Sequence, residues 1–287
     1  MSSAPSPHRS SSTSGPHHVL LAGCGDLGSH VGQLLHRSGH QVTGVRRNAE
    51  AAEVPFPVVS MDLADPGTVQ LPEADAVVIA LTADSYDAAG YERAYRSTLR
   101  GLAKALPTVP QRVVLVSSTG ALGDHEGEVI TEDSEPLPDR ETGKVLLASE
   151  QDAQELFDSV TILRAAGIYG PGRTRTIDQV LRGNPMDHGR ITNRIHRDDL
   201  SAAIARLVAV NNPPALLHGV DREPAPLGRV VEFVAGLLNV PVPEDSGSGR
   251  PHGKTLDGTA LHRFMGESGL QYPTFREGYS ALVEARA

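Results

Sequence analysis

The stretch from His18 to Gly32 constrains the fold of this chain more than any other. Its four apolar residues Val19 to Ala22 are typical of a parallel strand buried on both faces, since such a strand shows no alternation of polar and apolar residues. A GxGxxG pattern follows directly, and apolar residues then recur at helical spacing. The pattern predicts a strand, a tight turn and a helix whose N-terminus can bind phosphate groups.

The three glycines of this turn have separate expected roles. Gly23 permits the tight turn, Gly25 allows the backbone to approach a pyrophosphate, and Gly28 allows the helix to pack closely on the strand. We therefore expect a dinucleotide site rather than a purely structural turn. The residues expected to contact the dinucleotide here are Gly23, Gly25, Asp26, Leu27 and Gly28.

Strands and helices alternate in the chain that follows. Buried-strand patterns occur at Gln41–Val45, Val58–Met61, Ala76–Leu81 and Arg112–Val116, and a long crossover helix is expected at 87–106. One face of that helix is expected to carry Tyr91, Tyr95, Leu99, Leu102 and Leu106. The alternation predicts an α/β fold: a doubly wound parallel sheet of the Rossmann type with a smaller C-terminal lobe.

Ligands of such a sheet bind outside the carboxyl ends of its strands. Asp62 and Leu63 follow the third expected strand, and Leu81 and Thr82 lie at the end of the fourth. We therefore expect these four residues to contribute to the dinucleotide site.

The expected domain organisation follows from the same patterns. Residues 1–17 are rich in Ser and Pro and are expected to form a disordered tail. Residues 18–172 are expected to form the dinucleotide-binding Rossmann domain, to whose sheet residues 193–220 return. Residues 173–192 and 221–287 are expected to form the smaller lobe on the substrate side.

Composition excludes several classes of function. The formal net charge of −9 argues against nucleic acid or an anionic membrane as the main partner, and no apolar run could span a bilayer. Cys24 is the only cysteine, so no intrachain disulfide can form, and a reducing, cytoplasmic location is expected. No spacing of His, Cys or carboxylates fits a metal site, so none is predicted.

Two arginines indicate which dinucleotide the site prefers. NAD-binding proteins place an acid at the end of the second strand, roughly 20 residues past the glycines, to bind the ribose hydroxyls. This chain has Arg46 and Arg47 there instead. A guanidinium pairs with a 2′-phosphate, whereas a carboxylate repels it. We therefore expect NADP as the cofactor, with NAD as the alternative. A purely structural interpretation is that both arginines are solvated loop residues.

Three further motifs resemble a known family. The segments VVLVSSTGALG (113–123), TILRAAGIYGPGR (161–173) and NRIHRDDLSAAI (193–204) resemble elements of the extended short-chain dehydrogenase/reductases, also called the NAD-dependent epimerase/dehydratase family. The resemblance covers residues 18 to roughly 283 of this sequence. The C-terminal stretch from 253 to 282 resembles the atypical YeeZ-like branch of that family.

The resemblance implies a catalytic Y-x-x-x-K on the helix after the fifth strand, and this chain departs from that pattern. One register of the helix places Thr142 and Leu146 at the two positions, and the other places Arg140 and Lys144 there. Neither threonine nor arginine can replace a phenol as a proton shuttle near neutral pH.

Three other residues are candidates for the chemistry. The resemblance aligns Ser118 with the family's substrate-binding hydroxyl and places Tyr169 on the substrate side, while His196 could transfer protons because histidine titrates near neutrality. Each also has a structural reading: Ser118 bonded to the backbone, Tyr169 in packing, and His196 beside a helix that Asp198 is expected to cap.

These observations leave three functions open. The first is an NADP-dependent oxidoreductase or epimerase that acts on a small polar substrate, such as a nucleotide sugar. The second is a non-catalytic NADP-binding sensor or partner-binding protein on a degenerate dehydrogenase scaffold. The third is a binder of another nucleotide, or an isomerase that uses NAD(P) structurally. The identity of the substrate and the oligomeric state do not follow from the sequence.

Overall fold

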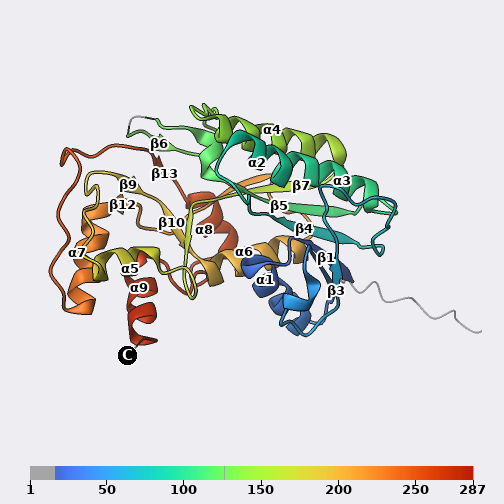
Figure 1. Ribbon diagram of the computed structural model, residues 1–287, viewed down its shortest axis with the longest axis horizontal. Coiled ribbons are helices and arrows are strands. Elements are labelled where there is room, and N and C mark those ends of the chain that lie inside the picture. Colours follow the sequence, from blue (N-terminus) through green and yellow to red (C-terminus); the bar gives the residue numbers. More distant parts are fainter. Residues whose placement is uncertain (1–16, 126, 287) are drawn as a thin grey trace, which may run out of the picture.

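A parallel sheet forms the centre of the molecule (Figure 1). The computed structural model describes residues 17–125 and 127–286, so all of the tail expected at 1–17 except His17 lies outside the described residues. Within those ranges the sheet has seven strands in the order β3-β2-β1-β4-β5-β7-β11, and every neighbouring pair is parallel. The strands are β1 (His18–Ala22), β2 (Gln41–Arg46), β3 (Val58–Ser60), β4 (Ala76–Ala80), β5 (Arg112–Ser118), β7 (Val160–Ala165) and β11 (Leu216–Gly219). This order confirms the predicted doubly wound fold.

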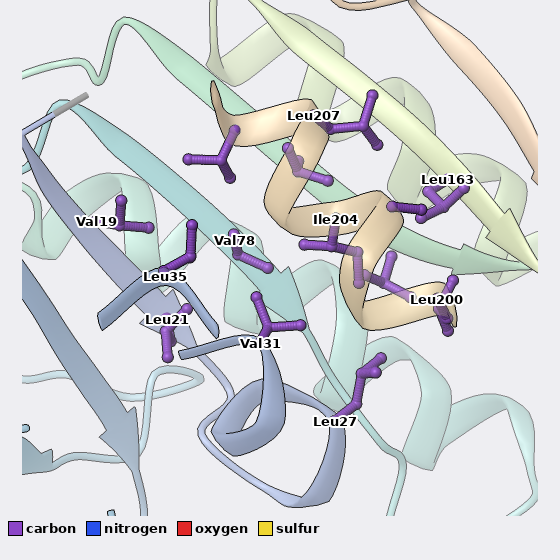
Figure 2. Packing of buried hydrophobic residues seen from close by; sticks show 14 of the residues in the cluster. Val19, Leu21, Leu27, Val31, Leu35, Val78, Leu163, Leu200, Ile204 and Leu207 are labelled. Carbon is purple, nitrogen blue, oxygen red and sulfur yellow. The ribbon is translucent and has the colours of Figure 1, made fainter. Parts of the chain in front are cut away.

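Helices cover both faces of the sheet. On one face, α1 (Asp26–Arg37) and α6 (Arg197–Ala209) pack against the strands, and Figure 2 shows Leu200, Ile204 and Leu207 of α6 within this apolar cluster. On the opposite face lie α3 (Thr98–Ala105) and α4 (Glu141–Leu156). Consecutive residues of the central strands therefore both enter a core, which explains why the strands showed no alternation.

Three helices form a smaller C-terminal lobe beside the sheet (Figure 1). They are α5 (Arg175–Leu181), α7 (Leu227–Leu238) and α9 (Phe275–Glu284), and they share an apolar cluster of their own. The helix α8 (Thr259–Met265) instead packs near β11 and α6.

Three short ribbons accompany the lobe. The pairs are β8 (Gly167–Tyr169) with β10 (Arg194–His196), β9 (Ile191–Thr192) with β12 (Ala225–Pro226), and β6 (Val129–Ile130) with β13 (Thr255–Leu256). These strands were not predicted, because two or three residues carry no detectable periodicity.

The expected crossover helix at 87–106 is not a single α-helix. It consists of α2 (Ala88–Tyr91), a π-helical segment η2 (Glu92–Ser97) and α3. The wider π turn shifts the phase of the residues before it relative to those after it. The leucines of α3 are buried, whereas Tyr91 and Tyr95 are only half-buried, so the residues predicted to share one face differ in burial.

A buried ion pair joins the sheet to α4. Arg164 Nη2 of β7 donates to Glu150 Oε2 at 2.7 Å, and Ser117 Oγ of β5 donates to Glu150 Oε1 at 2.6 Å. The Glu150 and Arg164 side chains are 3% and 5% exposed. Removing one partner of such a pair leaves a buried charge without compensation.

We expect Glu150→Gln to lower the free energy of unfolding by about 3–5 kcal/mol, because Arg164 would keep its charge and lose its partner. Glu141→Gln on the same helix is the matched control, since Glu141 pairs with Lys144 at 2.7 Å on the surface. That change should cost at most about 1 kcal/mol. Urea denaturation measures both, and equal losses would show that the buried pair contributes no more than the exposed one.

Candidate functional site

A cleft opens at the carboxyl ends of β1, β2, β3 and β4. It consists of two adjoining cavities, a larger one of about 440 Å³ and a smaller one of about 160 Å³. Both cavities are lined by Gly25, Ala80, Leu81 and Thr82, so the two cavities adjoin each other. This is the edge of a doubly wound sheet at which ligands bind.

The structure brings all the expected dinucleotide-binding residues to this cleft. Because parallel strands end at the same edge, residues distant in sequence meet there. The larger cavity is lined by Gly23, Gly25, Arg46, Arg47, Asp62, Leu63, Leu81 and Thr82. The smaller cavity is lined by Gly25, Asp26, Leu27, Gly28, Leu81 and Thr82.

The three glycines of the turn differ in what surrounds them. Gly23 has a φ of +97°, and a Cβ there would lie 2.1 Å from the Ala80 carbonyl oxygen. A Cβ on Gly28 would lie 2.1 Å from the Gly23 carbonyl oxygen. A Cβ on Gly25 would meet no described atom within 4 Å. The fold thus requires Gly23 and Gly28, whereas Gly25 leaves space open in the cleft.

Two ion pairs lie along the larger cavity. Arg47 donates to both carboxylate oxygens of Asp84, at 2.5 and 2.8 Å, and both side chains are exposed. These hydrogen bonds hold the pKa of the Asp84 carboxyl below its usual value. Arg93 of η2 donates to Asp62 at 2.6 Å. Asp84 and Arg93 were not predicted, because they follow β4 and reach the other strand ends only through the tertiary fold.

Charged side chains also gather at the N-terminus of α1. Arg173 Nε donates to Asp26 Oδ2 at 2.6 Å, and Arg197 Nη1 donates to Asp26 Oδ1 at 3.2 Å. Arg197 also donates to Asp198 Oδ1 at 3.2 Å, so the two guanidinium groups face two carboxylates, and the free N–H groups of the helix add partial positive charge. The mouth of the smaller cavity is suited to an anion.

Ser118 lines the smaller cavity at the end of β5. Its Oγ accepts a hydrogen bond from the Gly120 backbone N–H at 3.2 Å and caps the short helix η3 (Thr119–Leu122). Since Oγ accepts this bond, its own O–H remains available as a donor. The structural and substrate-binding readings of Ser118 are compatible with each other.

Tyr169 is not among the residues that line the cleft. Its ring packs 4.8 Å from that of Tyr279 in the lobe, and its hydroxyl donates to the Thr274 carbonyl at 3.4 Å. Burial raises its pKa well above the usual value. The structure therefore places Tyr169 in the packing between sheet and lobe, and corrects the expectation that it faces the substrate.

His196 is likewise absent from the residues that line the cleft. Its side chain is 1% exposed, and its Nδ1 accepts a hydrogen bond from the Asp198 backbone N–H at 3.2 Å. His196, and not Asp198 as expected, therefore caps α6. Burial lowers its pKa to about 4, so the ring is uncharged near neutral pH. These features correct its assignment as a proton donor.

The helix α4 contributes no residue to the lining of the cleft in the described ranges. Leu146 is buried, and Lys144 pairs with Glu141 on the surface. Tyr95 of η2 lines the smaller cavity instead. Sequence reasoning missed this residue because an uninterrupted α-helix would have turned it into the core.

A third cavity, of about 710 Å³, lies away from the cleft. It is bounded by β6, β13, α8 and the loop after β11, and the cleft's described lining includes none of its residues. Burial raises the pKa of Asp221, at its margin, to about 7. The cleft remains the better candidate for the functional site, because the glycine turn and the strand ends converge there and not at the 710 Å³ cavity.

Neither a metal centre nor a membrane span occurs in residues 17–125 and 127–286. No group of three or more His, Cys, Asp or Glu side chains there could hold a metal ion. No helix in those ranges is long and apolar enough to cross a bilayer.

Known proteins resemble this chain over most of its length. The family model for NAD(P)H-binding proteins matches residues 23–211. Protein YeeZ of Escherichia coli K12 is 30% identical over 277 residues, which cover 88% of this chain and 95% of YeeZ.

Solved structures agree with that match. A protein of Methylobacillus flagellatus assigned to the NAD-dependent epimerases/dehydratases has a TM-score of 0.79 and 32% identity, covering 94% of this chain and 98% of that one. MoeE5, solved with UDP-glucose and NAD, has a TM-score of 0.76 and 25% identity, covering 93% and 97%.

We expect Gly25→Val to abolish stabilisation by NADPH without unfolding the protein, because the new side chain would enter open space that a pyrophosphate needs. At a hundredfold excess over Kd, a ligand adds about 2.7 kcal/mol to the free energy of unfolding. Gly236→Val in α7 is the control, since a Cβ there also meets no described atom. Thermal unfolding with and without NADPH measures both. A Gly25→Val protein still stabilised by NADPH would show that the phosphates lie elsewhere.

Proposed function

The chain belongs to the NAD(P)H-binding family, as a YeeZ-like extended short-chain dehydrogenase/reductase, and on that premise we propose that it is an NADP-dependent oxidoreductase acting on a small polar substrate. The observation that carries the proposal is the cleft itself. All eleven residues expected to bind the cofactor line it, and it has space open at Gly25.

The pyrophosphate would bind at the glycine turn. Gly25 offers an unobstructed approach, and the N-terminus of α1 provides backbone N–H groups. Arg173 and Arg197 lie beside that terminus, where both pair with Asp26 and Arg197 also pairs with Asp198. The adenosine would then lie in the larger cavity near Asp62 and the nicotinamide in the smaller one near Ser118.

The arginines after β2 favour NADP over NAD. Arg47 presents a planar fork to the larger cavity, and a carboxylate, Asp84, already occupies that fork. A 2′-phosphate carries more charge than a carboxylate and can take over the same bidentate contact. Arg46 lines the same cavity and adds a second positive charge.

The substrate would enter beside the smaller cavity. The bound cofactor supplies a hydride there, and Ser118 can hold a carbonyl oxygen by donating a hydrogen bond to it. Arg173 can bind an anionic group of the substrate. MoeE5, which shares this fold, was solved with UDP-glucose, so nucleotide sugars are the first class of substrate to test.

A second candidate function is a non-catalytic NADP-binding sensor. The absence of any described α4 residue from the cleft lining favours it, since the family's acid/base pair comes from that helix. General acid/base catalysis contributes about 10²–10⁴-fold. We therefore expect negligible epimerisation or dehydration of UDP-glucose and UDP-glucuronic acid. Turnover of either at ordinary enzymatic rates would contradict the loss of that pair.

We expect Arg47→Ala to weaken NADPH binding ten- to hundredfold and leave NADH binding unchanged. One charge-assisted hydrogen bond is worth about 1.5–3 kcal/mol. Asp84→Asn should have the opposite effect on NADPH, because it removes both a competitor for Arg47 and a charge that repels the phosphate. Nicotinamide fluorescence titrations measure both variants. An equal loss of NADPH and NADH affinity in Arg47→Ala would show that Arg47 does not bind the 2′-phosphate.

A further inference from the structure

The lining of the smaller cavity includes a tyrosine to whose hydroxyl the proposed function assigns no role. Tyr95 of η2 lines this cavity together with Ser118 at the end of β5 and Arg173 after β8. Its ring lies 5.4 Å from that of Tyr91, and its hydroxyl has no hydrogen-bond partner in the part of the chain that the structure describes. A half-buried hydroxyl without a partner, at the wall of a cavity, is available to a ligand.

The backbone around Tyr95 explains how a helix residue reaches the cleft. The segment Glu92–Ser97 is π-helical, and such single wide turns occur frequently at functional sites. The leucines of α3 that follow remain buried in the core. The π turn thus allows Tyr95 to reach the strand ends while the same helix anchors itself against the sheet.

Resting on the proposed function, we propose that Tyr95 is the proton donor for reduction of a carbonyl substrate in the smaller cavity. The carbonyl carbon accepts a hydride, with its electron pair, from the reduced nicotinamide. The carbonyl π electrons move to oxygen, and this oxygen takes the proton of the Tyr95 hydroxyl. The products are an alcohol and the oxidised cofactor, and the Tyr95 phenolate regains a proton from water.

The surroundings of Tyr95 favour donation of its proton over removal of a proton from the substrate. Burial, together with smaller contributions from the phenols of Tyr91 and Tyr86, raises its pKa to about 12. The charged groups in the lining of the same cavity, Asp26 and Arg173, are paired with each other. Tyr95 therefore keeps its proton near neutral pH and can donate it, whereas it is a poor base for removing a proton from a substrate alcohol.

Fluorine NMR of the protein labelled with fluorotyrosine tests the proposal. The chain has six tyrosines, and Tyr95→Phe and Tyr91→Phe assign the two resonances needed. Saturating NADP⁺ should move the Tyr95 resonance. Its titration midpoint should also be lower in the NADP⁺ complex than in the NADPH complex, because only the oxidised nicotinamide carries a positive ring charge. Tyr91, on the same helical run but outside the cleft lining, is the control and should respond much less.

A separate measurement of NADPH binding distinguishes a failure of the proton-donor role of Tyr95 from a failure of the proposed cofactor site. Tyr95→Phe should bind NADPH with unchanged affinity, since the hydroxyl is assigned to the substrate. If wild-type protein binds NADPH but the Tyr95 resonance and midpoint are the same with NADP⁺, NADPH or neither, the proton-donor role is wrong and the cofactor site stands. If wild-type protein binds neither cofactor, both proposals are wrong.

Discussion

The close approach of the glycine turn to the end of β4 determines the shape of the cleft. Gly23 adopts a positive φ where any side chain would strike the Ala80 carbonyl, and Gly28 packs against Gly23 in the same way. These two contacts bring the N-terminus of α1 down onto the strand ends. Gly25, between them, is consequently left facing open space. The phosphate-binding role that we propose for the site therefore rests on backbone geometry, to which side chains add charge.

The charges around the cleft are arranged in pairs that a ligand could exchange. Arg47 pairs with Asp84 and Arg173 with Asp26, and all four side chains are at least one-third exposed. Such exposed pairs contribute little to stability, about 0–1 kcal/mol each. Their partners can therefore be replaced by phosphate at small cost. The buried pair of Arg164 and Glu150 differs in this respect, because it holds α4 on the sheet and faces no cavity in the described ranges.

The sequence predicted the fold and the residues that meet at the cleft, because both depend on local patterns. Buried strands, the glycine turn and the strand ends are encoded within a few residues each, and a parallel sheet then brings the ends together. The two catalytic candidates Tyr169 and His196 were misplaced for a different reason. Their burial results from packing against the lobe, through Tyr279 and Tyr272, and no local pattern shows that contact. Tyr95 was misplaced because a π turn leaves no signal in an apolar periodicity that continues on both sides of it.

The central claim is that the cleft binds NADP with its nicotinamide in the smaller cavity. A crystal structure of the protein with NADPH tests it most directly. The account predicts the 2′-phosphate within hydrogen-bond distance of Arg47, the pyrophosphate over Gly25, and the nicotinamide ring between Tyr95 and Ser118. A dinucleotide bound in the cavity beside Asp221, or one whose nicotinamide ring points into solvent, would contradict it.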